Sequence, residues 1–394
     1  MSGLKKTLVS FLGKTKDDKN YQETTYRMPD SARTFKTRFL GINLARELKC
    51  DRLLLLGTET SMWDNLILEY LQEEGLLDSF EGKDLSEKLS LVQEILGKTL
   101  GMEVTAQIIP MGKNEQEQLE ILGIMASNIQ SLDEVFIDVT HGFRHLSMLS
   151  ILVASYLEVV NKIRVKSFYY GAFDMMEDKI CPIISLSGYS KLLSWIRALE
   201  SFDASGNIGV FASLYKDEGV DSRTLADAGF YERTNQVREA RNKISTFRQQ
   251  DKEIESRSPL LKLFHPILER RTNWYRKTKR SEYELDLAKS YRKKGDWTRA
   301  VIYFLEGYYS REIEKAGQNP DNYETRSLMK EDLKRGEDKD PKLYTLACIR
   351  NVVAHTKFES RGTPHDKIVE RYLSSEEKLA SFLRELTNSL LKEE

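Results

Sequence analysis

The sequence predicts two parts of different class, an α/β N-terminal half built on a doubly wound, mostly parallel sheet and an all-α C-terminal half. Up to about residue 187, short apolar runs alternate with segments of helical periodicity, which is typical of strand–helix–strand crossovers. Beyond that point no strand pattern remains, and helix-period segments are separated by Gly206, Gly219, Pro259, Gly295 and Pro320. The 394 residues allow two or three domains.

Five apolar runs are the expected strands, and a polar or glycine-rich turn follows most of them. The runs are Leu8–Leu12, Leu53–Leu56, Val104–Ile109, Val135–Ile137 and Val165–Tyr169. Ligands of open α/β sheets bind outside the carboxyl ends of the strands, so we expect these turns to form a ligand site. The expected ligand-binding residues are Gly13, Lys14, Thr15, Thr58, Thr60, Ser61, Met62, Trp63, Gly112, Lys113, Asn114, Thr140, His141, Gly142, Arg144 and Gly171.

The turn after the fourth run predicts an anion site rather than a nucleotide-binding fingerprint. A phosphate loop is disfavoured at Gly13 because Leu8 stands where its first glycine is needed, and no G-x-G-x-x-G follows any strand. Residues 138–144 pass through Gly142 into a helix start, whose free N–H groups favour an anion. Arg144 in that first turn opposes the helix dipole unless a phosphate lies between them. Pairing of Arg144 with a surface acid is the competing interpretation.

Neither a metal nor a disulfide framework is predicted. His141 and His145 have a possible i, i+4 ligand spacing, but a third ligand is missing and Gly142 occupies the glutamate position of H-E-x-x-H. The three cysteines, Cys50, Cys181 and Cys348, are far apart and form no C-x-x-C pair, which fits a reducing cytoplasm. We therefore expect no metal and no cofactor.

The chain has nearly equal numbers of basic and acidic residues, but they are unevenly distributed along the sequence. The 60 Lys+Arg and 61 Asp+Glu exclude a uniformly basic nucleic-acid coat. Residues 231–294 nevertheless hold twice as many basic as acidic residues, most densely at 270–280, where Trp274 and Tyr275 interrupt the charges. This pattern suits single-stranded nucleic acid, with Arg276, Lys277 and Arg280 as candidate RNA contacts, but a solvated helix with two core aromatics explains it equally well.

The longest apolar stretch, Leu146–Val160, is expected to be a buried helix that is too short to span a bilayer, so no membrane partner is predicted.

The segment from Arg350 to His355 places a guanidinium, the amide of Asn351 and an imidazole near an expected helix end. On an ideal helix, residues five apart differ by about 140°, so Arg350 and His355 do not share a face. One copy therefore makes a poor catalytic pair, whereas two copies around a two-fold axis can combine.

Two groups of motifs resemble a known protein family. Residues 134–149, with residues 56–64, resemble the sensor domain of CRISPR-associated ancillary proteins, the CARF (CRISPR-associated Rossmann fold) domain, which binds cyclic oligoadenylate across a homodimer. Residues 350–355 resemble the R-x-x-x-x-H signature of HEPN ribonucleases, and residues 287–301 resemble a HEPN helix pair. The resemblance implies a Rossmann-like sensor over 1–187 and a HEPN domain over 285–394. The basic helical linker between them, 188–284, resembles nothing that we can name.

The resemblance also implies a function. The chain is expected to be a cytoplasmic, metal-independent endoribonuclease of the type III CRISPR response, cleaving single-stranded RNA as a homodimer or a higher even oligomer. Its expected activator is a cyclic oligoadenylate from the type III effector complex, cyclic tetra-adenylate being the commoner ligand of this architecture. Arg350 would stabilise the phosphorane, Asn351 would orient the phosphate or the imidazole, and His355 would transfer protons. Two alternatives stay open, a non-catalytic ligand-responsive nucleic-acid binder and a ring nuclease whose chemistry lies near Thr140 and His141.

Overall fold

The computed structural model describes residues 4–14, 21–70, 82–130, 133–334, 340–355 and 363–392. The chain divides into two compact units, residues 1–193 and 194–394, here called the N-terminal and C-terminal units. The division falls within the helix α7 (Ser187–Ser205). The finer boundary expected at residue 285 stays a prediction.

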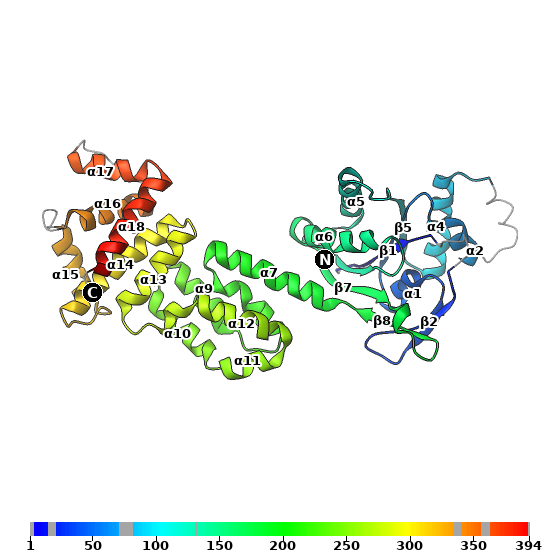
Figure 1. Ribbon diagram of the computed structural model, residues 1–394, viewed down its shortest axis with the longest axis horizontal. Helices are drawn as coiled ribbons and strands as arrows, with labels where there is room; N and C mark the ends of the chain where they lie inside the picture. Colours follow the sequence, from blue (N-terminus) through cyan, green and yellow to red (C-terminus); the bar gives the residue numbers. More distant parts are fainter. Residues whose placement is uncertain are drawn as a thin grey trace. The chain divides into compact units, whose positions relative to one another are not determined.

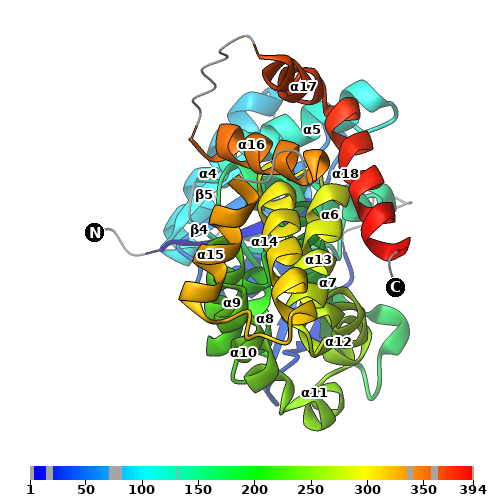
Figure 2. The same ribbon diagram turned by 90° about the vertical axis from the view of Figure 1, so that its left-hand side faces the viewer.

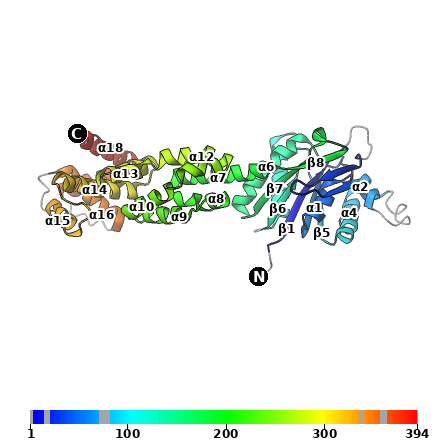
Figure 3. The ribbon, with the colours of Figure 1, turned by 90° about the horizontal axis from the view of Figure 1, so that it is seen from below.

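The N-terminal unit is built on an eight-stranded sheet of order β3-β2-β8-β7-β6-β1-β4-β5 (Figure 1). The strands are β1 (Lys6–Leu12), β2 (Thr24–Arg27), β3 (Thr34–Thr37), β4 (Arg52–Gly57), β5 (Glu103–Ile108), β6 (Glu134–Asp138), β7 (Arg164–Gly171) and β8 (Ile180–Ser185). The five expected strands are β1, β4, β5, β6 and β7, and they form the parallel part of the sheet. Figure 3 shows β8, β7, β6 and β1 in neighbouring positions.

Helices cover both faces of this sheet, so the doubly wound prediction is confirmed. The helices are α1 (Leu40–Glu47), α2 (Trp63–Tyr70), α4 (Leu85–Leu100), α5 (Glu115–Asn128) and α6 (Arg144–Val160), with a 3₁₀ turn, η2 (Phe173–Met175). Neighbouring residues of a strand point to opposite faces. Leu8 accordingly packs in one core cluster with residues of α1, α2 and α4, whereas Val9 packs in a second cluster with residues of α5 and α6.

The other edge of the sheet mixes parallel and antiparallel pairs. Strand β8 pairs antiparallel with β7, β2 pairs parallel with β8, and β3 pairs antiparallel with β2. These three strands were not expected from the sequence.

The prediction of a buried helix over Leu146–Val160 is correct for the helix but wrong for one of its faces. Leu146, Val153 and Leu157 are buried, whereas Met148 and Leu152 are 73% and 67% exposed. Apolar residues lie on every side of this helix, so the sequence does not distinguish the core-facing side from the outer side. No helix of the described residues is long and apolar enough to cross a membrane.

The described part of the C-terminal unit is helical, as expected. Its elements are η3 (Ile208–Phe211), α8 (Ala212–Asp217), α9 (Arg223–Arg233), α10 (Val237–Arg248), α11 (Asp251–Arg257), α12 (Pro259–Arg271), η4 (Asn273–Arg276), α13 (Arg280–Lys293), α14 (Trp297–Lys315), α15 (Tyr323–Lys334), α16 (Pro341–His355), α17 (Pro364–Leu373) and α18 (Glu376–Lys392). Helix α14 packs against α13, α15 and α16 (Figure 2).

The expected helix breaks lie where the sequence places them. Gly295 (φ 73°) separates α13 from α14, and the Asp296 side chain accepts from the Arg299 N–H, 3.0 Å away, at the start of α14. Pro259 is at the first position of α12, behind the Ser258 cap. The expected helix pair over residues 287–301 is thus α13 and α14.

Candidate functional site

The first candidate site lies at the switch point of the sheet, where β1 is flanked by β4 on one side and β6 on the other. Gly13 follows β1 and Gly142 follows β6, and the two turns nearly touch. A Cβ on Gly13 would lie 2.7 Å from the backbone nitrogen of Gly142, and Gly142 itself has a φ of 103°. Both positions therefore require glycine, because a side chain would separate the turns or strain the backbone.

The turn after β4 is bonded to the turn after β1. The Met62 N–H donates to the Gly13 carbonyl at 3.1 Å, and the Ser61 hydroxyl donates to the Leu12 carbonyl at 2.7 Å. Trp63 is buried, and its Nε1–H donates to the Thr58 carbonyl at 2.9 Å. A cleft of about 500 Å³ opens beside these turns. Its lining includes Lys14, Thr60, Ser61, Met62, Trp63 and Lys88.

A cluster of buried polar groups lies next to the turns at the switch point and holds them in place. The Asp138 carboxylate is fully buried and accepts from the Ser10 hydroxyl (2.8 Å) and the Thr140 N–H (3.0 Å). The Tyr21 hydroxyl accepts from the Gly13 N–H at 2.8 Å, and its ring stacks on the His141 imidazole with centroids 4.2 Å apart.

The protonation of this cluster follows from its burial. Desolvation lowers the pKa of His141 although the nearby Asp138 charge opposes the shift, and desolvation raises the pKa of Tyr21. The imidazole is therefore favoured in its neutral form. Within the described residues, His141 Nε2 is buried without a hydrogen-bond partner.

Two further turns complete the rim. The Gly171 N–H donates to the Thr140 hydroxyl at 2.8 Å, which fixes the end of β7 against the turn after β6. His145 Nε2 lies 2.7 Å from the Met111 carbonyl and ties the turn after β5 to α6. In that turn Gly112 has a φ of 74°. Asn114 caps α5, its side chain accepting from the Glu117 N–H at 2.9 Å.

The first residue of α6 is Arg144, which is exposed. Phe143 precedes it and offers no capping side chain, and no acidic residue stands in the first turn. Since the N-terminal N–H groups and Arg144 all favour a negative charge, this end of α6 suits an anionic ligand. Among the residues that the structure describes, Arg144 has no ion-pair partner, which disfavours its pairing with a surface acid.

The second candidate site lies at the end of α16 in the C-terminal unit. Arg350 is half-buried, and its Nη1 donates to the Asn351 side-chain oxygen at 3.0 Å. His355 is exposed and is the last residue of α16. Tyr309 of α14 is close enough to Arg350 for the guanidinium to lower the Tyr309 pKa, against a larger rise from burial. Arg350 thus lies near Tyr309 of α14, whereas the His355 side chain is exposed at the end of α16.

The basic segment at 270–280 is not an exposed stacking platform. Trp274 and Tyr275 are buried in the 3₁₀ turn η4, so the structure favours core aromatics over base-stacking ones. The Arg276 guanidinium pairs with Glu269. Arg280 pairs with Glu284 at 2.8 Å and with Asp321 at 2.6 Å. Lys277 is exposed.

Comparison with known proteins gives a family match for the part of the chain that carries the first site. Residues 7–174 match the family described as CRISPR system endoribonuclease Csx1, CARF domain. This range contains β1 to β7 and every rim turn described above. The N-terminal unit thus matches the Csx1 CARF domain over these residues. CARF domains generally bind cyclic oligoadenylates, so the rim is the place where such a ligand is expected.

A CRISPR-associated relative also aligns with most of this chain. The chain is 24% identical to the CRISPR-associated protein MJ1674 of Methanocaldococcus jannaschii, over 91% of this chain and 63% of the relative. The chain therefore spans less than two thirds of the length of the relative that it matches. The resemblance to CRISPR-associated CARF proteins, recognised from residues 56–64 and 134–149, is confirmed.

The structure brings most of the expected ligand residues of the CARF domain to one rim, and it distinguishes their roles. Trp63, Asn114 and Gly171 have the structural contacts described above. Lys14, Lys113 and Arg144 are exposed at the rim and carry positive charge. Thr15, also expected there, lies outside the described residues. The possible metal pair does not form on one helix face, because His141 precedes the start of α6 and His145 follows it.

Sequence reasoning missed Tyr21, whose hydroxyl and ring hold both Gly13 and His141. Nothing in its local sequence marks it, since its role depends on β1 and β6 meeting in space.

Proposed function

We propose that this Csx1-family chain is a cyclic-oligoadenylate-activated, metal-independent endoribonuclease that cleaves single-stranded RNA as a homodimer in the type III CRISPR response. The observation that carries the proposal is the presence, in one chain, of a CARF rim and of the Arg350–His355 pattern at the exposed end of a helix. HEPN chemistry for the second site rests on the sequence resemblance.

The charges and shape of the rim support a phosphate-rich ring as activator. Lys14 and Arg144 supply charge at two neighbouring turns, and the start of α6 supplies free N–H groups. The close approach of Gly13 and Gly142 leaves the backbone uncovered by side chains, so a phosphate can come near it. Cyclic tetra-adenylate is the activator that we favour.

The exposed face of α6 supports a homodimer. Met148, Leu152, Tyr156 and Val159 are exposed along this helix at spacings that place them on one side. Contiguous apolar patches are rare on monomeric proteins and typically mark an interface. Since Arg144 begins the same helix, a two-fold axis beside α6 would bring two ligand rims together around one ring.

The proposed chemistry uses a group of the RNA itself as nucleophile. The 2′-oxygen forms a bond to the adjacent phosphorus, the bond from phosphorus to the 5′-oxygen breaks, and the products are a 2′,3′-cyclic phosphate and a 5′-hydroxyl. His355 transfers the proton lost by the 2′-hydroxyl or gained by the 5′-oxygen. Arg350 stabilises the charge on the phosphorane, and Asn351, already bonded to Arg350, orients the phosphate or the imidazole.

The test uses Arg350→Ala and His355→Ala, with His365→Ala as a matched control on a different helix. We expect the first two variants to lose RNA cleavage while binding cyclic tetra-adenylate within a few fold of wild type, and the control to cleave. Full activity of Arg350→Ala and His355→Ala would refute the HEPN assignment. If the wild-type protein binds RNA but does not cleave it in the presence of cyclic tetra-adenylate, a non-catalytic nucleic-acid binder is favoured instead.

A ring nuclease is the second candidate function, because the buried, neutral-favoured His141 lies directly beside the rim. Incubation of the protein with labelled cyclic tetra-adenylate tests it, and linear products that disappear in His141→Ala would establish it.

A further inference from the structure

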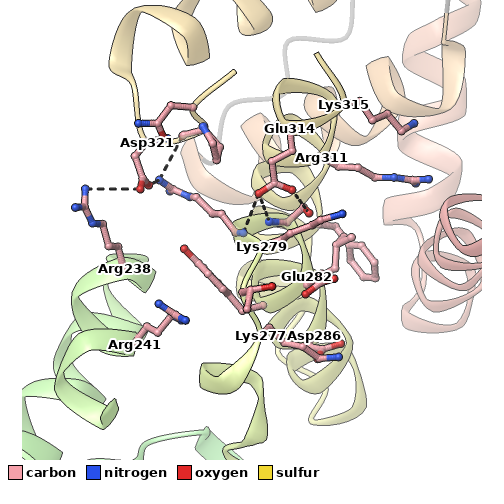
Figure 4. Close-up of a pocket in the computed structure, with 18 of the residues that line it drawn as sticks. Arg238, Arg241, Lys277, Lys279, Glu282, Asp286, Arg311, Glu314, Lys315 and Asp321 are labelled. Carbon is pink, nitrogen blue, oxygen red and sulfur yellow. Dashed lines mark hydrogen bonds and ion pairs between the residues drawn. The ribbon is translucent and has the colours of Figure 1, made fainter. Parts of the chain in front are cut away.

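A groove of about 870 Å³ lies in the C-terminal unit between α10 and the α13–α14 pair. Figure 4 shows Arg238 and Arg241 extending from α10 on one side, with Lys277, Lys279 and Glu282 across from them. Lysine and arginine side chains outnumber carboxylates along the lining. The volume falls within the range of sites that hold small ligands or a short stretch of a longer one.

Two of the carboxylates in the groove are already used by the fold. Glu314 of α14 accepts from the backbone N–H groups of Arg280 (2.8 Å) and Ser281 (3.3 Å), so it closes the otherwise uncapped start of α13. Asp321 pairs with Arg280 at 2.6 Å and more loosely with Arg238 at 3.7 Å. These contacts neutralise Arg280 and leave the other cations in excess.

Three cations of the groove, Lys277, Lys279 and Arg241, are placed to meet a ligand. Lys277 and Lys279 are exposed, and among the residues that the structure describes their side-chain ammonium groups have no hydrogen-bond or ion-pair partner. Arg241 is held in place by its Nε–H, which donates to the Tyr275 carbonyl at 2.9 Å, and its guanidinium lies 5.5 Å from the centre of the Tyr283 ring. Such a preorganised guanidinium loses little conformational freedom when it binds a phosphate.

The aromatic rings at the groove are not available to bases. Tyr283 and Phe304 line it but are buried, and so are Trp274 and Tyr275 beside it. Proteins that bind single strands through their bases present exposed rings for stacking. The chemistry of this groove instead suits a phosphodiester backbone, recognised by charge.

We propose that this groove is a docking site for the phosphodiester backbone of single-stranded RNA, formed by Arg238, Arg241, Lys277 and Lys279 and independent of base identity. The inference rests on the proposed ribonuclease function and names where its substrate is held. It retains Lys277 among the RNA contacts expected from the sequence. Arg276 and Arg280 instead hold the surrounding helices through Glu269, Glu284 and Asp321.

The test measures RNA affinity separately from cleavage. Full-length protein carrying His355→Ala is titrated against labelled U-rich and A-rich single strands by fluorescence anisotropy over a range of KCl concentrations. Lys277→Ala/Lys279→Ala is compared with Lys216→Ala/Lys262→Ala, which removes the same charge from exposed positions outside the groove. Thermal unfolding confirms that both double variants are folded.

We expect the groove variant to bind both RNAs more weakly and with a shallower salt dependence, whereas the control stays close to the parent. Each lost phosphate contact reduces the slope of log K against log salt by about 0.7, so two contacts reduce it by about 1.4. If affinities converge at 1 M salt, this difference is roughly 25-fold at 0.1 M.

Three results would overturn the inference. The salt slope could be unchanged in the groove variant, the control could lose as much RNA affinity as the groove variant, or affinity could fall for only one of the two RNAs. A loss of cyclic tetra-adenylate affinity with RNA affinity unchanged would also overturn it. The proposed function fails separately: protein with an intact His355 that does not cleave RNA in the presence of the ring would refute it, even if the groove variant shows the expected loss of binding.

Discussion

We predict that the stability of the C-terminal unit depends on pH through Glu232. Its carboxyl group is buried on α9, where it accepts from the Tyr291 hydroxyl at 2.5 Å. Desolvation raises its pKa from 4.5 to about 7, although the Tyr291 hydrogen bond and the charges of Arg299 and Lys294 oppose the rise. Folding therefore favours the protonated form.

The sign and size of the effect follow from this shift. The stabilisation by the protonated group is fully present below the unfolded pKa of 4.5 and is lost as the pH rises through about 7. At 1.36 kcal/mol per pKa unit, the loss is roughly 3 kcal/mol by pH 8.5. Glu232→Gln keeps an oxygen for Tyr291 but does not titrate, so it should match wild type near pH 5 and exceed its stability at pH 8.5.

Urea unfolding of both proteins, followed by circular dichroism at pH 5, 7 and 8.5, measures this difference. Glu239→Gln, which removes an exposed carboxylate on the next helix, is the control and should show no such divergence. If the free energy of unfolding changes with pH in the same way in wild type and Glu232→Gln, the reasoning is refuted. Such a result would show that ionisation of the buried carboxylate does not destabilise the folded protein.

Three further predictions concern the proposed function. Arg144→Ala should raise the concentration of cyclic tetra-adenylate needed for half-maximal RNA cleavage by one to two decades, because a charge-assisted bond to phosphate contributes roughly 1.5 to 3 kcal/mol; an unchanged activation curve would move the ligand away from the start of α6. Leu152→Glu should convert the dimer to a monomer in analytical ultracentrifugation, whereas Leu263→Glu, at a similarly exposed leucine of α12, should not; a dimer in both variants would place the interface elsewhere. Ring-activated cleavage should persist in EDTA, and loss of activity that a divalent ion restores would require a different mechanism.

The parallel core of the sheet was predictable because its strands are continuous apolar runs. Every residue of β4 is buried, and runs of this kind are typical of strands covered on both faces. The edge strands were not predictable by the same signal. Strand β3 is largely exposed, and β8 contains Pro182, a residue that removes a donor from the ladder and counts against a strand in any sequence pattern.

The turns of the candidate site were predictable as a set. Which of their side chains are buried in the core and which are exposed at the rim was not predictable. Strand ends show which turns share a rim, whereas burial separates Trp63, which lies in the core, from Arg144, which lies at the surface. In the C-terminal unit, one of the two partners of Arg280 is Asp321, which is remote in sequence. Charge counts therefore located the basic region but did not show which cations are already neutralised.

The central claim is that binding of a cyclic oligoadenylate at the CARF domain controls cleavage of RNA. The most direct measurement is the initial rate of cleavage of a labelled single-stranded RNA by the wild-type chain with and without saturating cyclic tetra-adenylate, in EDTA, with analysis of the product ends. The account predicts little cleavage without the ring, rapid cleavage with it, and 2′,3′-cyclic phosphate ends. Equal rates in both conditions, or no cleavage in either, would contradict it.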